Sequence, residues 1–188
     1  MPGWANIANL FTLLRLGLVP FVVLAILQGS HLVALVLFIA AGLTDVIDGA
    51  LARGFGLATP SGAYLDPIAD KCLLCGIFLA LGSSGIIPWW FVAVVFGRDL
   101  YILVGVLGFL ALTNVRKFPP SIWGKASTFV QISTAVVWMV RNIWMARNIP
   151  NVPVLHALSS AMLWVCAGFT IWSGLDYTRR GVQLIRAH

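Results

Sequence analysis

The feature that most constrains this chain is a succession of long apolar runs, separated by short polar breaks. A run of roughly 20 apolar residues is long enough to cross the hydrocarbon core of a bilayer as a helix. Of the 188 residues, 60% are hydrophobic and only 10% are charged, whereas soluble domains carry about 25% charged residues. The runs are continuous and lack the period-two alternation of half-buried strands. The sequence therefore predicts an all-α integral membrane protein.

Six transmembrane helices account for these runs. We expect them at about Asn9–Gln28, Leu32–Ala52, Gly62 to the Gly82–Gly85 stretch, Trp89–Leu112, Trp123–Trp144 and Val154–Tyr177. Because the polar breaks between them are short, residues 1–188 are predicted to form a single transmembrane domain.

The distribution of basic residues predicts the orientation of these helices. Lys and Arg accumulate in cytoplasmic loops of membrane proteins. With six spans, the side shared by both termini collects Arg15, Arg53, Arg116, Lys117, Arg179, Arg180 and Arg186. Arg141 and Arg147 lie near the last opposite loop, where long basic side chains can reach the interface. Both termini are therefore predicted to be cytoplasmic.

Four of the six acidic residues lie in one stretch, DVIDGALARGFGLATPSGAYLDPIAD, at residues 45–70. Asp45 and Asp48 are one helical turn apart near the end of the second run, as are Asp66 and Asp70 near the start of the third. Charged side chains inside a membrane are costly and usually functional. If the two helices pack antiparallel, the clustered carboxylates need a cation. Oxygen ligands without His or Cys favour Mg²⁺, Mn²⁺ or Ca²⁺ over zinc.

The same stretch contains residues suited to a ligand that carries phosphate. Gly49 and Gly62 leave room for close approach of a ligand or of a neighbouring backbone. Arg53 supplies a planar fork of donors for an anion. Two metal ions between carboxylates and a diphosphate would stabilise the leaving oxygen of an in-line displacement.

The spacing D-x2-D-G-x2-A-R-x8-G-x3-D-x3-D resembles the signature of the CDP-alcohol phosphatidyltransferases. Every fixed position is filled, by Asp45, Asp48, Gly49, Ala52, Arg53, Gly62, Asp66 and Asp70. The segments NIANLFTLLRL and WGKASTFVQ resemble further parts of the same family. In the first of these, Arg15 is expected to contact the nucleotide or lipid headgroups.

This resemblance implies a transfer of the phosphatidyl group from CDP-diacylglycerol to an alcohol, with release of CMP. It implies two Mg²⁺ or Mn²⁺ ions bound by the four aspartates of the motif, with Asp70 also acting as the general base. It further implies that Gly49, Arg53 and Gly62 bind the CDP moiety, and that the protein is a homodimer.

The acceptor alcohol is less constrained. LDPIADK resembles the branch that makes phosphatidylglycerophosphate and cardiolipin. Glycerol 3-phosphate needs several basic donors, and phosphatidylglycerophosphate synthases tend to carry Arg-Glu in the fourth helix and Gly-Lys-x-Lys-Thr in the fifth. Here Arg98 precedes Asp99, and Ser127 stands in place of the second Lys. The sequence therefore favours phosphatidylglycerol as acceptor (a cardiolipin synthase), with glycerol 3-phosphate as the alternative; Arg98, Arg116 and Lys125 are the candidate acceptor ligands.

Other classes of function fit less well. A divalent-cation transporter would distribute acidic residues through the depth of the membrane, whereas these lie near one predicted face. A catalytically inactive subunit does not need four intact carboxylates. Nucleic-acid binding needs a basic face outside the membrane, and the net charge of +6 instead suits anionic lipid headgroups. No Arg- and Ser-rich segment precedes the first run, so we expect a bacterial plasma membrane location with the active site facing the cytoplasm.

Overall fold

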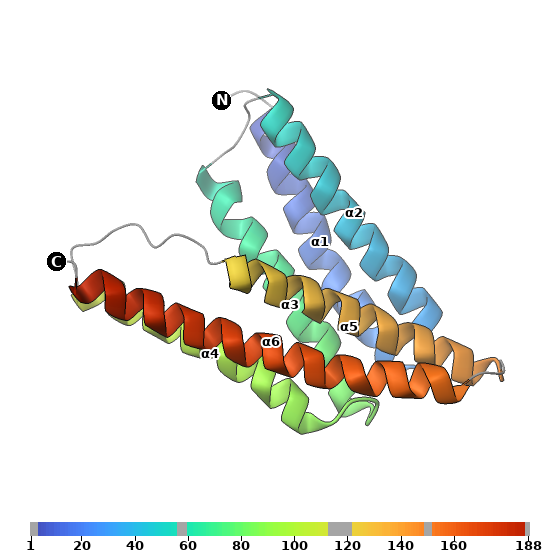
Figure 1. The fold of residues 1–188 in the computed structure, drawn as a ribbon. Helices are drawn as coiled ribbons and strands as arrows, with labels where there is room; N and C mark the ends of the chain where they lie inside the picture. Colours follow the sequence, from blue (N-terminus) through green and yellow to red (C-terminus); the bar gives the residue numbers. More distant parts are fainter. Residues whose placement is uncertain (1–3, 56–59, 113–121, 149–151, 187–188) are drawn as a thin grey trace. The chain divides into compact units, whose positions relative to one another are not determined.

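The structure is a computed structural model that describes the backbone of residues 4–55, 60–112, 122–148 and 152–186. Side chains are described for residues 12–44, 69–105, 108, 122–148 and 153–183. The described residues form helices joined by turns and contain no strand (Figure 1). The helices are α1 (Trp4–Leu27), α2 (His31–Phe55), α3 (Pro60–Ser83), α4 (Trp89–Leu112), α5 (Ile122–Ala146) and α6 (Val152–Arg186). The all-helical prediction, with one helix for each apolar run, is confirmed over these residues.

Glycines end α1 and α3 by the same mechanism. Gly29 and Gly85 have φ angles of 73° and 68°, a left-handed conformation that is cheap only without a side chain. After α1, the amides of Gly29 and Ser30 donate to the carbonyls of Ile26 and Ala25. The amides of Gly85 and Ile86 repeat this pattern at the end of α3. These are Schellman caps, in which the last carbonyls of a helix find donors while the chain reverses.

The sixth helix extends beyond the predicted span, from Tyr177 to Arg186. Arg180 Nε and Asp176 Oδ2 form an i,i+4 ion pair at 2.8 Å across this boundary, and the Thr178 hydroxyl donates to the carbonyl of Gly174. The apolar run therefore ends before the helix does, because polar residues can continue a helix outside the hydrocarbon region.

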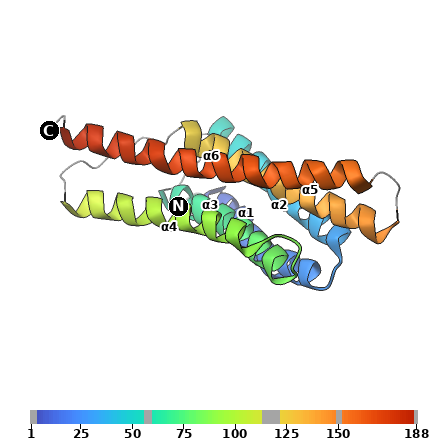
Figure 2. The ribbon, with the colours of Figure 1, turned by 60° about the horizontal axis from the view of Figure 1, so that its bottom comes forward.

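The helices cluster into two compact units, which are described separately. The first consists of Met1–Ile86 with Asn142–Asn148, and the second of Ile87–Arg141 with Ile149–His188. In the first unit, α1 packs against both α2 and α3. In the second unit, α4 and α6 pack side by side, which both views show (Figures 1 and 2). That residues 1–188 form a single transmembrane domain stays a prediction.

The core of the first unit follows the helical period. Among the described side chains of α1, the buried residues are Thr12, Arg15, Val22, Ala25 and Ile26, which fall on one stripe of a helix. This stripe contains a charged residue, Arg15, among apolar ones. Its burial requires a partner from another helix, because a buried charge without compensation is strongly destabilising.

Part of the described chain is long and apolar enough to cross a membrane. This segment is Pro153–Gln183 on α6, and shorter apolar stretches occupy Thr12–Leu27 and His31–Thr44. Large apolar side chains such as Phe21, Leu100 and Phe129 are exposed, which agrees with contact to lipid. The number of spans and the side of the termini stay predictions.

Candidate active site

The acidic motif begins in the second half of α2, at residue 45, and finishes near the middle of α3, at residue 70. Residues 45 and 48 are one turn apart in helical backbone, and so are residues 66 and 70. Seven of the eight motif positions lie outside the residues whose side chains are described, namely Asp45, Asp48, Gly49, Ala52, Arg53, Gly62 and Asp66. Whether the carboxylates converge therefore stays a prediction. What the structure adds is that α2 and α3 share one packing partner, α1.

Asp70 is the acidic residue of the motif whose side chain the structure describes, and it is paired with Arg15 on α1. Arg15 Nη1 donates to Asp70 Oδ1 at 2.6 Å. The exposure of the two side chains is very unequal, at 1% for Arg15 and 48% for Asp70. The guanidinium thus lies inside the α1–α3 interface, and the carboxylate stands at its edge.

Sequence reasoning predicted a nucleotide or headgroup contact for Arg15 and missed its partner. A signal was available, because the apolar run that contains Arg15 has no acidic residue of its own. A charge inside such a run needs an opposite charge from another helix. The sequence could not select which aspartate supplies it.

The helices α1 and α3 approach each other closely near the Arg15–Asp70 ion pair. A Cβ atom added to Gly76 would lie 3.0 Å from Val23 Cγ2 and 3.2 Å from Val19 Cγ1. Val19 and Val23 follow Arg15 at successive helical turns of α1, so they share its face. The glycine allows the two helices to approach near the ion pair, and Ala69 beside Asp70 is buried as well.

The metal ions implied by the motif would have to be held by oxygen ligands from α2 and α3. Among the described side chains, no group of three His, Cys, Asp or Glu residues lies together, and three of the four expected ligands fall outside that set. The half-exposed carboxylate of Asp70 is compatible with a role as ligand, because the ion pair with Arg15 leaves it accessible. Carboxylate oxygens suit Mg²⁺ and Mn²⁺.

In the second unit, Arg98 is held by two partners. Its Nη1 donates to Asp99 Oδ1 at 2.8 Å, and its Nη2 donates to the Ser173 hydroxyl on α6 at 2.5 Å. The Arg98 side chain is only 10% exposed. It lines a groove of about 330 Å³ between α4 and α6, together with Tyr101 and Thr178, whose hydroxyls are 2.7 Å apart. Arg98 is thus a neutralised arginine at a mostly apolar groove that contains a few polar groups.

The other two candidate acceptor ligands have different positions. Lys125 lies in the first turn of α5 and is exposed. Arg116 lies outside the described residues. Ser127, which stands in place of a family lysine, is fully buried. Its hydroxyl lies within 3.5 Å of Gln131 Nε2 and Thr170 Oγ1, so it belongs to a polar cluster between α5 and α6.

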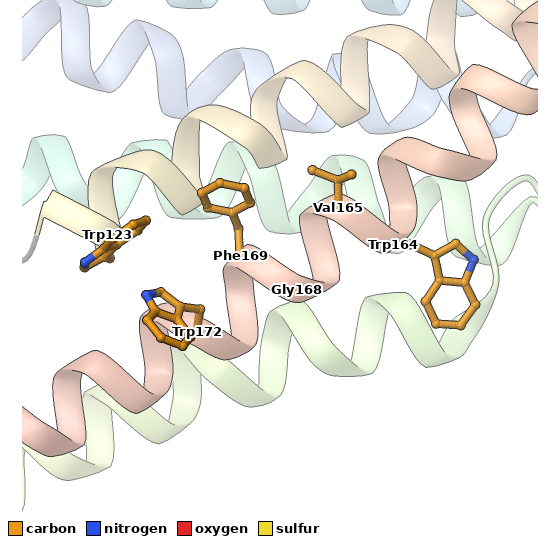
Figure 3. Close-up of a pocket in the computed structure, with 6 residues that line it drawn as sticks. All are labelled: Trp123, Trp164, Val165, Gly168, Phe169 and Trp172. Carbon is orange, nitrogen blue, oxygen red and sulfur yellow. The ribbon is translucent and has the colours of Figure 1, made fainter.

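A second groove of about 400 Å³ lies along α5 and α6 (Figure 3). It is lined by Trp123, Trp164, Val165, Gly168, Phe169 and Trp172. Trp123 packs edge-on to Trp172 with ring centroids 6.0 Å apart. The groove lies on the apolar segment of α6 and contains no titratable side chain, so it offers contact area for hydrocarbon and no group for catalysis.

Comparison with known proteins identifies the class. The family model described as CDP-alcohol phosphatidyltransferase matches residues 5–172. The chain therefore belongs to the CDP-alcohol phosphatidyltransferase family and is an enzyme of that class, as the acidic motif predicted.

Individual relatives point to one branch of this family. A "Probable phosphatidylglycerophosphate synthase" of Mycobacterium tuberculosis (strain H37Rv) is 35% identical over 95% of this chain and 83% of its own length. A "CDP-diacylglycerol--glycerol-3-phosphate 3-phosphatidyltransferase" of Bacillus subtilis is 29% identical over 96% of this chain and 97% of its own length. A "Putative cardiolipin synthase" of M. tuberculosis (strain H37Rv) is 35% identical over 66% of this chain and 59% of its own length.

Proposed function

We propose that this protein transfers the phosphatidyl group of CDP-diacylglycerol to a glycerol-bearing phosphate acceptor and releases CMP. The acceptor hydroxyl oxygen bonds to the phosphorus that carries the diacylglycerol, and the bond from that phosphorus to the CMP oxygen breaks. Asp70 takes the hydroxyl proton. The observation that carries this proposal is the complete acidic motif within a chain that the family model matches from residue 5 to residue 172.

The residues of the motif have separate tasks in this reaction. Asp45, Asp48, Asp66 and Asp70 would hold two Mg²⁺ or Mn²⁺ ions, and Gly49, Arg53 and Gly62 would contact the CDP moiety. When bound, the ions neutralise the diphosphate and stabilise the leaving oxygen. The side-chain contact that supports this arrangement is that of the buried Arg15, which anchors the half-exposed Asp70 near the middle of α3.

We favour glycerol 3-phosphate as the acceptor. The relatives named for that activity match 95% and 96% of this chain, whereas the relative named for cardiolipin synthesis matches 66%. Arg98, Arg116 and Lys125 would bind the acceptor phosphate, and Arg98 lines a groove with two hydroxyl groups nearby.

Phosphatidylglycerol, the acceptor that the sequence pattern favours, is the second candidate. Ser127 contributes no positive charge at its position, and Asp99 balances the charge of Arg98, so little positive charge is available to a small dianion. A lipid with one phosphodiester charge requires fewer bases.

A direct assay separates the two acceptors. Purified protein in lipid nanodiscs receives CDP-diacylglycerol with Mg²⁺ or Mn²⁺, and either glycerol 3-phosphate or phosphatidylglycerol. We expect CMP release with glycerol 3-phosphate and none after Asp48→Asn. CMP release with phosphatidylglycerol alone would make the protein a cardiolipin synthase. No CMP release with either acceptor would refute both assignments.

The proposed setting is a bacterial plasma membrane, crossed six times by one domain, with both termini and the active site at the cytoplasmic face. Support comes from the six apolar runs and from Arg179 and Arg180 at the end of the apolar segment of α6. Reporter fusions after residues 30, 86 and 188 test the orientation. A periplasmic signal from the last fusion would overturn it. On the basis of the family resemblance we also propose that the protein is a homodimer. Light scattering in detergent tests this oligomeric state.

A further inference from the structure

We infer that Arg15 is a positioning residue for the reaction. It holds the carboxylate of Asp70 from its buried side, in the orientation that the metal ions and the acceptor hydroxyl require. This inference rests on the proposed function. Arg15 does not belong to the acidic motif and lies 55 residues before Asp70 in the chain.

The unequal burial of the pair indicates this direction of action. A surface ion pair has two exposed partners and contributes little. Here the Arg15 side chain is 1% exposed while that of Asp70 is 48% exposed, so the carboxylate is held from its buried side and accessible from the other. A residue that orients a reactive group should have this geometry, because it fixes the group without covering it.

The surroundings of Arg15 are buried and closely packed. Thr12, one turn before Arg15 on α1, is buried as well. The close approach of Gly76 to Val19 and Val23 fixes the distance between α1 and α3 on the same face of α1. Close packing of α1 against α3 limits the freedom of the guanidinium, and the guanidinium in turn limits rotation of the Asp70 side chain.

Replacement of Arg15 should affect the orientation of the Asp70 carboxylate more than the charge around it. A carboxylate that must bind a metal ion loses affinity when its own hydrogen-bond partner is removed, typically by about 10- to 100-fold. Arginine presents several donors in a planar fork, whereas lysine presents a compact ammonium on a flexible stem. Lysine at position 15 should therefore restore the charge but only part of the orientation.

The test measures metal binding in the absence of turnover. Mn²⁺ is titrated into purified protein in nanodiscs, and free Mn²⁺ is followed by electron paramagnetic resonance, for wild type, Arg15→Gln and Arg15→Lys. We expect Arg15→Gln to weaken Mn²⁺ binding by about 10- to 100-fold, to lower kcat by a similar factor and to change the KM of CDP-diacylglycerol less. Arg15→Lys should be intermediate between wild type and Arg15→Gln in Mn²⁺ binding and in kcat.

Arg141 provides a matched control. It is also a buried arginine, but it lies in the second unit, where its guanidinium stacks over Trp138 at 4.4 Å and contacts His156. Arg141→Gln should lower the melting temperature without weakening Mn²⁺ binding. If Arg15→Gln changes only the melting temperature, as this control does, the inference is wrong. If Arg15→Gln does not fold, the same measurements on Arg15→Lys test the inference. Unchanged Mn²⁺ binding and kcat in Arg15→Lys would then refute the inference.

The effect must also depend on Asp70. In an Asp70→Asn background, Arg15→Gln should weaken Mn²⁺ binding no further, because the group it positions has lost its charge. A full additional loss would mean that Arg15 acts elsewhere. Failure of the inference remains distinct from failure of the proposed function: in the latter case the wild-type protein itself neither binds Mn²⁺ nor releases CMP.

Discussion

Arg98 on α4 and Ser173 on α6 are joined by a hydrogen bond of 2.5 Å, from Arg98 Nη2 to the serine hydroxyl. Ser173 is fully buried, and Asp99 balances the charge of the same guanidinium. This contact links a candidate acceptor ligand to the helix that has the longest apolar segment among the described residues. Arg98 therefore has a structural task in addition to the one we propose for it.

Ser173→Ala tests the structural task. The substitution leaves a donor of the nearly buried guanidinium without this acceptor, which typically costs about 1–3 kcal/mol. We expect a lower melting temperature in detergent, with turnover at saturating acceptor largely retained. A variant as stable as wild type would mean that the 2.5 Å contact contributes nothing.

Arg98→Ala tests the proposed ligand role. Loss of charge-assisted hydrogen bonds to the acceptor phosphate should raise the acceptor KM by about 10- to 100-fold, while the KM of CDP-diacylglycerol changes little. The measurement is initial-rate kinetics with each substrate varied in turn. An unchanged acceptor KM beside a lower melting temperature would leave Arg98 with its structural role only.

Gly76→Ala, compared with Gly168→Ala, tests the packing that supports Arg15. Alanine replaces glycine favourably in a helix by about 1 kcal/mol, and a Cβ at Gly168 meets nothing within 4 Å. At Gly76 the same atom would lie 3.0 Å from a valine methyl, and overpacking costs about 1–3 kcal/mol. Thermal unfolding should show Gly168→Ala to be the more stable variant. An equal increase in melting temperature for both variants would indicate that α1 and α3 can separate freely.

Ser127→Lys tests the branch of the family by restoring a family lysine. Because Ser127 is fully buried beside Gln131 and Thr170, we expect the ammonium to destabilise the protein rather than raise its activity. The checks are the melting temperature and the rate with glycerol 3-phosphate. Ser127→Ala is the control for loss of the hydroxyl alone. Faster turnover at unchanged stability would show that this position can reach the acceptor.

Metal removal tests the ions directly. Chelation with EDTA should abolish CMP release, and added Mg²⁺ or Mn²⁺ should restore it, because the diphosphate then regains its counter-charge. The protein should stay folded throughout, as judged by circular dichroism. Full activity after exhaustive chelation would contradict the role assigned to the aspartates.

The helices could be predicted because their signals are local. Each apolar run became a helix, and Gly29 and Gly85 end α1 and α3 by adopting conformations that other residues rarely adopt. The end of α6 was predicted too early, because hydropathy marks the hydrocarbon region and not the last turn of a polar helix. The i,i+4 ion pair of Asp176 with Arg180 lies in the part of α6 that continues beyond the apolar run.

The sequence by itself determined the class of enzyme, because the acidic motif is a run of residue types at fixed spacing that can be read without knowing the fold. Only the tertiary structure decided that Arg15 pairs with Asp70, that Arg98 is anchored to Ser173 and that Ser127 is buried. Such partners come from helices far apart in the chain, and several alternatives have the same charge or polarity. The packing of helices at close range, as at Gly76, selects among them.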